Sequence, residues 1–252
     1  MPSGTIQCPS GLAGEIRSPK AAEIAQFMES DQKTTSRAFG SILSACWLQT
    51  TAPGPYKLPD GLNPKWDEVL VGDRLFAWIR MRVLGFGKDL RFKFQCDSVR
   101  CRDRNPERQP WKADLDLLTV KGLPATSAEA FKAGNVHTTQ VAGRQVKFRL
   151  LTGTLEREIE QRFGGDAPVS MFDALAFRIL EIEGVDKTGV QAWLGEQDWG
   201  DVRALQGALD EADCGVDLGI EVQCKFQSCR RVVGLQVPFD ESWFTTTREA
   251  SP

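Results

Sequence analysis

Two pairs of cysteines with the same spacing are the residues of this sequence best suited to chemistry. Cys96 and Cys101 lie in FKFQCDSVRC, and IEVQCKFQSC contains Cys224 and Cys229. Four thiolates from two chain reversals can surround one tetrahedral ion, and all-sulfur coordination favours zinc over iron. Four sulfur ligands leave no position for water, so such an ion would hold the two segments together and not catalyse. We therefore predict one structural zinc site, formed by Cys96, Cys101, Cys224 and Cys229.

The spacing of the cysteines leaves an alternative open. C-x4-C is a loose knuckle compared with the commoner C-x2-C, and 122 residues lie between Cys101 and Cys224. That separation is compatible with one site, because the cost of closing a loop rises only slowly with its length. Reduced or pairwise oxidised thiols are the alternative to zinc. Cys8, Cys46 and Cys214 have no matching partners, and we expect the last two to be buried thiols.

The elements that position the cysteines are two predicted hairpins. Apolar residues alternate with polar ones over residues 90–96 and 220–224, which is typical of strands with one buried face. The alternation resumes over residues 111–117 and 233–239, after each cysteine pair. The sequence therefore predicts a zinc-ribbon-like unit assembled from two distant antiparallel hairpins.

Helices fill most of the remaining chain, which makes the predicted fold class α+β. Apolar residues recur three or four apart over residues 21–47 and 66–87, and in three segments between the cysteine pairs, SMFDALAFRILEIEG among them. The predicted organisation is an extended N-terminal arm (1–19), a helical region with a proline-rich loop (20–88), the first cysteine hairpin (89–120), a hairpin with a helical insertion (121–215), the second cysteine hairpin (216–240) and a tail (241–252).

Composition limits the possible partners and the compartment. The 252 residues carry a net charge of −3, so the chain lacks the bulk positive field that general nucleic-acid binding needs. No apolar run approaches the ~20 residues that cross a bilayer, and the N-terminus lacks the pattern of a signal peptide. We therefore expect a cytoplasmic protein without membrane contacts.

Residues for catalysis are not evident. The single histidine, His137, excludes histidine-rich metal sites, and its place in an alternating strand predicts a structural role. Asp114 and Asp116 lie opposite an apolar strand face, and the glutamates of TLEREIEQRF lie on the wet side of a helix. A hydrolase or transferase would need a nucleophile–base pair, so we predict no catalytic residues and no enzyme activity.

Several stretches, taken in order, are similar to a known family. Besides the two cysteine pairs they are PSGLAGEIR from Pro9, ACWLQT from Ala45, LVGDRLFAWIRMRVLGFG from Leu70, FRLLTG from Phe148, EIEGV from Glu181 and DCGVDLGIEVQC from Asp213. Over most of the chain the series resembles the baseplate hub assembly proteins of T-even-type contractile-tailed phages, a family also found in related contractile injection systems. The cysteine pairs of that family resemble ribbon knuckles with tighter spacing than here.

The resemblance implies a non-enzymatic assembly chaperone or subunit of the baseplate hub. Its partners would be other hub proteins, and it would act in the cytoplasm of the producing bacterium. The alternative is a zinc-ribbon nucleic-acid-binding or transcription-related protein, whose phosphate contacts would weaken steeply with salt. Its support is a set of basic residues around the two cysteine pairs: Arg91, Lys93, Arg100, Arg102, Arg104, Arg108, Lys225, Arg230 and Arg231.

Overall fold

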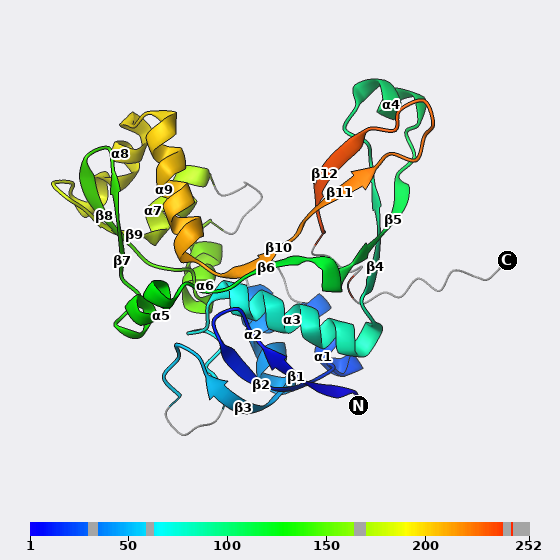
Figure 1. Cartoon of the computed structure of the whole chain (residues 1–252), viewed down its shortest axis with the longest axis horizontal. Coiled ribbons are helices and arrows are strands. Elements are labelled where there is room, and N and C mark those ends of the chain that lie inside the picture. Colours follow the sequence, from blue (N-terminus) through cyan, green and yellow to red (C-terminus); the bar gives the residue numbers. More distant parts are fainter. Residues whose placement is uncertain (30–34, 59–62, 164–169, 239–242, 244–252) are drawn as a thin grey trace.

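Helices and antiparallel strands make up the chain, in the α+β class that the sequence predicts. The computed structural model describes residues 1–29, 35–58, 63–163, 170–238 and 243. Figure 1 shows three parts: a base that contains the N-terminus, a helical lobe, and a pair of hairpins that extends away from both.

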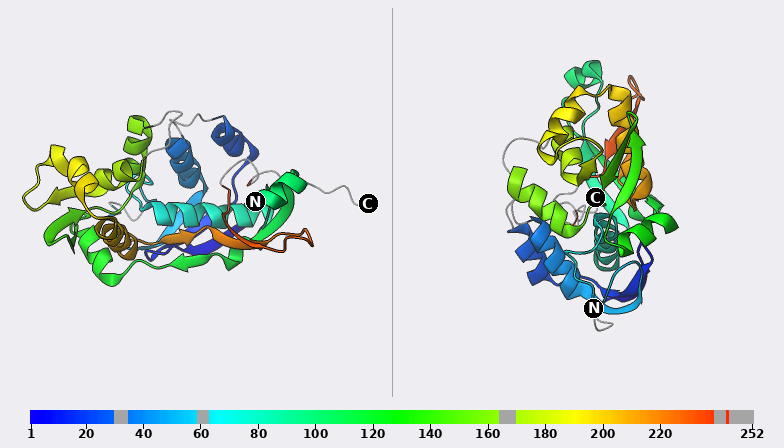
Figure 2. Two further views of the ribbon diagram at one scale, coloured as in Figure 1. Left: turned by 90° about the horizontal axis from the view of Figure 1, so that it is seen from above. Right: turned by 90° about the vertical axis from the view of Figure 1, so that its left-hand side faces the viewer.

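The base is a three-stranded sheet with helices. Its strands are β1 (Ser3–Gln7), β2 (Leu12–Arg17) and β3 (Trp47–Pro53), in the order β1-β2-β3, and its helices are α1 (Ala21–Met28), α2 (Thr35–Cys46), α3 (Val71–Phe86) and α6 (Gly153–Phe163). In Figure 2, α1 and α2 lie on one side of α3 and the strands lie on the other. The central helix α3 is therefore covered on both sides.

The prediction of an extended N-terminal arm is wrong, because residues 1–19 form the β1–β2 hairpin. Leu12 and Ile16 are buried in the main core, and Gly11 turns the chain with a left-handed φ of 92°. The glycines and prolines of this segment suggested a loop, but alternating apolar side chains bury one face of the hairpin. The strand β3 also replaces the beginning of the predicted proline-rich loop.

Two buried charges anchor α3 in the base. The Asp73 carboxylate accepts hydrogen bonds from the Ser10 backbone at 2.9 Å and from the Tyr56 hydroxyl at 2.6 Å, and its burial raises its pKa. The Arg74 guanidinium is fully buried, lies 2.5 Å from Glu156 of α6 and donates to the Ser36 carbonyl of α2 at 2.8 Å. Each buried charge is thus paired or hydrogen-bonded, as burial requires.

The helical lobe combines a three-stranded sheet with short helices. The strands β7 (His137–Val141), β8 (Arg144–Phe148) and β9 (Ile179–Ile182) pack with α5 (Ala125–Lys132), α7 (Met171–Arg178), η2 (Lys187–Gly189), α8 (Val190–Glu196) and α9 (Trp199–Ala212). Ser170 caps α7, accepting a hydrogen bond from the Asp173 N–H at 3.1 Å. The predicted continuation of this helix to Gly184 is wrong, because residues 179–182 pair with β8 instead.

Two antiparallel hairpins form the third part, as predicted. One consists of β4 (Asp89–Phe94), α4 (Val99–Arg104) and β5 (Gln109–Asp114), and the other of β11 (Gly219–Gln223) and β12 (Val232–Gln236). We call residues 88–114 and 218–237 the hairpin pair. A short ribbon of β6 (Thr119–Lys121) and β10 (Gly215–Asp217) joins it to the rest, with η1 (Leu115–Leu117) between β5 and β6.

Arg82 fixes the hairpin pair to the end of α3. Its guanidinium donates to the backbone carbonyls of Gly87 and, at 2.8 Å, of Asp89, where β4 begins. Its Nε also donates to the carbonyl of the buried Trp243 at 3.2 Å. The rest of the predicted tail, residues 241–252, lies outside the described residues. The orientation of the first hairpin is thus set by a buried arginine of the base.

Candidate metal centre

The four predicted ligands meet at the tips of the hairpin pair. Cys96 lies two residues after the end of β4 and Cys101 lies in α4, whereas Cys224 directly follows β11 and Cys229 precedes β12. Inward-facing side chains of both hairpins, Phe94 among them, are buried, so the tips are held side by side (Figure 1). Strand alternation therefore aims cysteines from distant parts of the sequence at one point.

The positions of the four sulfurs suit a tetrahedral ion. The Sγ atoms of Cys96 and Cys229 are 3.8 Å apart, those of Cys101 and Cys224 are 3.7 Å apart, and all four lie within 4.8 Å of one another. Zn–S bonds of about 2.3 Å give a tetrahedral S···S edge of about 3.8 Å. These separations are much longer than a disulfide bond, about 2.05 Å, and the four cysteines are free thiols. A metal ion fits among them with small adjustments.

Gln109 connects the two hairpins beside the sulfur cluster. Its Nε2 donates to the Cys224 Sγ at 3.2 Å, and its Oε1 accepts from the Lys225 backbone N–H at 2.8 Å. On the exposed side, Arg231 and Asp97 form a 3.4 Å ion pair between the hairpins. Sequence reasoning missed Gln109, whose signal was a polar side chain at an inward position of an alternating strand. An amide in this position orients the sulfur ligand.

Equal spacing is realised by different local structures in the two cysteine pairs. In α4, the Cys101 N–H donates to the Ser98 carbonyl at 3.0 Å. Between β11 and β12 a tight turn replaces the helix, with the Cys229 N–H donating to the Phe226 carbonyl at 2.9 Å. The next residue, Arg230, has a left-handed φ of 52°. Both structures bring the second cysteine of a pair back to the first.

The environment favours neutral thiols at two of the ligands. Burial raises the pKa of Cys96, and it raises that of Cys101 to about 12. Burial acts in the same direction on Cys224, but hydrogen bonds from the Phe226 backbone and from Gln109 outweigh it, and the pKa of Cys224 is lowered. A bound divalent ion would displace the remaining thiol protons, because metal ligation requires thiolates.

The other candidate residues take structural positions. His137 is buried in β7, where its ring stacks on Phe148 at 5.4 Å, and burial lowers its pKa. Cys46 and Cys214 are buried thiols, as predicted. Glu156, expected on a solvated helix face, instead pairs with the buried arginine of α3.

The remaining acidic candidates also form ion pairs. Asp114 lies 2.6 Å from Lys88, and Asp116 lies 2.5 Å from Arg80. Within the described ranges, the four cysteines are the one group of three or more acidic, histidine or cysteine side chains placed to bind a metal ion. The structure thus brings together the predicted metal ligands and no second constellation of that kind.

Comparisons with known proteins assign no relative to the chain. No protein-family model matches it, and neither a curated protein nor a solved structure matches it significantly. Among the described residues, none of the helices has the length and apolar character that crossing a bilayer requires. Function must therefore be argued from the cysteine cluster and its surroundings.

Proposed function

We propose that this chain is a non-enzymatic assembly protein whose hairpin pair is clamped by one structural zinc ion. The observation that carries the proposal is the four-sulfur cluster, whose edges of 3.7 and 3.8 Å suit tetrahedral zinc. With all four coordination positions filled by protein, zinc has no place for a substrate or an activated water. The ion would therefore act on the architecture.

The zinc clamp would connect the tips of the two hairpins, where few other contacts connect them. Two-stranded ribbons are marginally stable by themselves, and each hairpin here is such a ribbon. Cys101 and Cys224 are 123 positions apart, so one ion would tie the two distant hairpins into one body. A rigid, projecting pair of hairpins is suited to contact another protein, because its binding surface is ordered before association.

We assign this assembly role to the baseplate hub of a contractile phage tail or related injection system. The support is the ordered series of stretches that resembles the hub assembly proteins, which runs from the β1–β2 hairpin through α3 to Cys224. On this proposal the chain acts in the cytoplasm of the producing bacterium, beside other hub proteins.

Metal analysis tests the clamp. Protein purified without added metal should contain about one zinc per chain, and Cys96→Ser and Cys224→Ser should both lose it, since each removes one of four ligands. Cys46→Ser, which removes a buried thiol outside the cluster, is the matched control and should keep the metal. Wild-type protein without metal, or zinc retained in both ligand variants, would contradict the clamp.

Genetic removal tests the assembly role. Deleting the coding sequence from a producing bacterium should abolish complete tails in electron micrographs, and the wild-type chain supplied in trans should restore them. The Cys96→Ser chain should fail to restore them if the clamped hairpins are needed. Normal particles in the deletion strain would overturn the assignment to the baseplate and leave the metal clamp as a separate result.

A further inference from the structure

Charge is unevenly distributed along this acidic chain. The hairpin pair contains eleven lysines and arginines against six acidic residues, whereas residues 122–217, which include the helical lobe, contain nine against sixteen. These regions lie at opposite ends of the molecule in Figure 1. The hairpin pair is therefore a local positive region on a protein whose net charge is −3, and such a region attracts anionic partners.

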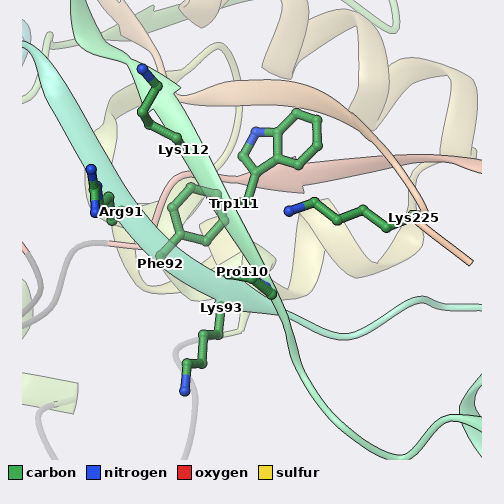
Figure 3. A pocket seen from close by; sticks show the side chains of 7 residues that line it. All are labelled: Arg91, Phe92, Lys93, Pro110, Trp111, Lys112 and Lys225. Carbon is green, nitrogen blue, oxygen red and sulfur yellow. The ribbon is translucent and has the colours of Figure 1, made fainter. Parts of the chain in front are cut away.

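A cleft in this region combines cations with an aromatic side chain. It has a volume of about 610 Å³ and is lined by Arg91, Phe92, Lys93, Pro110, Trp111, Lys112 and Lys225. Figure 3 shows Trp111 projecting from β5 on the side of Lys225, which comes from the other hairpin, while Arg91 and Lys93 project from β4. Phe92 is buried and Trp111, its register partner, is partly exposed on the inward side of the ribbon, whereas the exposed Pro110 lies among the cations and gives the cleft apolar surface.

The cations of the rim include one unfavourable cross-strand pair. Arg91 lies directly opposite Lys112 in the β4–β5 register, and like charges in that position destabilise a strand pair. Lys112 is compensated by Asp89 at 3.2 Å. Neither Lys93 nor Lys225 forms an ion pair within the part of the chain that the structure describes. These two ammonium groups are available to an external anion.

The metal cluster does not account for these cations. Four thiolates and one zinc ion carry a net charge of −2, which Arg102 and Arg104 of α4 can balance. Lys93 and Lys112, however, alternate with inward-facing residues, so their side chains lie on the exposed face of the ribbon. Positive charge on that face needs a different explanation.

We propose that this cleft is a docking site for an acidic segment of a partner protein. The segment lies extended across the exposed face of the ribbon, with carboxylates on Lys93, Lys112 and Lys225 and an apolar side chain against Pro110, which lies opposite Lys93 in the register. This proposal rests on the proposed assembly function and adds the chemistry of the partner. Carboxylate pairs with partly exposed lysines contribute mainly to the rate and specificity of association, and the apolar contact contributes to affinity.

The boundaries of the basic surface favour a peptide over a nucleic acid. Asp89 and Asp114 lie opposite each other on the same exposed ribbon face, at the end nearest the base. Asp97 follows β4 at the other end. A nucleic acid is charged along its whole length, so its flanking phosphates would compete with these carboxylates for Lys88, Lys112 and Arg231, which are their ion-pair partners. A short acidic segment can place its charges between them.

Binding of a defined peptide tests the docking site. The probe is a fluorescein-labelled peptide in which glutamate alternates with leucine and one central phenylalanine, titrated into full-length protein and followed by anisotropy. We expect saturable binding that weakens with salt, is weakened roughly tenfold or more by the double variant Lys93→Glu/Lys225→Glu, and is lost when glutamine replaces glutamate in the probe.

A matched variant and a second probe make the result decisive. Lys57→Glu/Lys132→Glu changes the net charge equally, at exposed lysines outside the cleft, and should bind the peptide like wild type. No peptide binding, or equal binding by both double variants, would overturn the docking site. Tighter, cleft-dependent binding of oligo-dT than of the peptide would also overturn it, in favour of a nucleic-acid surface.

Failure of the docking site and failure of the proposed function are distinguishable. The Lys93→Glu/Lys225→Glu protein should retain its zinc and its thermal unfolding transition, because neither lysine is a ligand. If it retains both and restores complete tails in the deletion strain, the docking site is wrong and the assembly role stands. If the deletion strain makes normal tails, the assembly role is wrong whatever the peptide does.

Discussion

The hairpin pair and the base each hold together segments that are distant in the sequence, but by different means. At the tips of the hairpins four sulfurs and one buried amide connect two thin ribbons. In the base, α3 is surrounded by strands and helices, and its buried Asp73 and Arg74 bond to four separate elements or loops. On the proposed function, the difference teaches that a metal ion connects segments where too little apolar surface can be buried, whereas buried ion pairs connect them where a core already excludes water.

The strongest test of this contrast is removal of the metal. Chelation, or Cys101→Ser, should disorder the hairpin tips and leave the base folded, because structural zinc supplies about 10–16 kcal/mol of apparent binding free energy in small metal-folded units. Hydrogen exchange should show loss of protection in β4, β5, β11 and β12 and unchanged protection in α3. Uniform loss of protection would mean that the two regions do not differ in this way.

The converse test removes a charge from the base. Arg74→Met should lower the free energy of unfolding by roughly 3–5 kcal/mol, because Glu156 and the Ser36 carbonyl lose their buried partner. Urea denaturation measures the loss, and the zinc content should not change. The control is Arg157→Met, whose partly exposed pair with Asp67 should be worth about 1 kcal/mol or less. Equal losses in the two variants would contradict the role assigned to burial.

Acid should weaken the base through Glu23. Its pKa is lowered to about 2, chiefly by the hydrogen bond from Arg17, which lies 2.6 Å away. A lowered folded-state pKa gives stability that is present above the unfolded value of 4.5 and lost as the pH falls towards 2. Glu23→Gln should therefore cost up to about 3 kcal/mol at neutral pH and progressively less below pH 4.5. A cost that does not change with pH would contradict this pairing.

The smallest expected effects distinguish the local structures of the two cysteine pairs, a helix at the first tip and a turn at the second. Arg230→Gly should stabilise the second tip by roughly 0.5–1 kcal/mol, because glycine adopts the left-handed φ of 52° without strain. Arg102→Gly should destabilise the first tip by about 1 kcal/mol, since it lies in α4. The rate of zinc transfer to a chelator compares them. If both substitutions changed the rate of zinc transfer in the same direction, the distinction between a helix at the first tip and a turn at the second would be contradicted.

The sequence predicted the four-cysteine cluster because the signal was local and occurred twice. Alternation in residues 90–96 and 220–224 fixed the direction of Cys96 and Cys224, and the repeated spacing linked the pairs. The contact of Gln109 with Cys224 was not predictable, since it depends on how two hairpins 115 positions apart are placed. α+β class and the principal helices followed from periodicity in the same way.

The sequence analysis did not predict several strands that pair with segments distant in the sequence. β6 and β10 have three residues each, too few for any pattern, and exist because Thr119–Lys121 meets Gly215–Asp217. β9 follows α7 without a break, because pairing with β8 overrides the helical periodicity of the sequence. The N-terminal hairpin was hidden by its glycines and prolines, of which Pro9 and Gly11 lie in the turn between β1 and β2, whereas Gly4 and Gly14 lie within the strands.

The ribbon of β6 and β10 has a mechanical consequence. β5 leads through η1 into β6, and β10 leads almost directly into β11, so both hairpins continue into the two strands that carry the lobe. A force applied to the lobe is transmitted along this ribbon to both hairpins together. The sulfur cluster connects the two hairpins at the far end from the ribbon. Under such a force it resists sliding of one hairpin past the other.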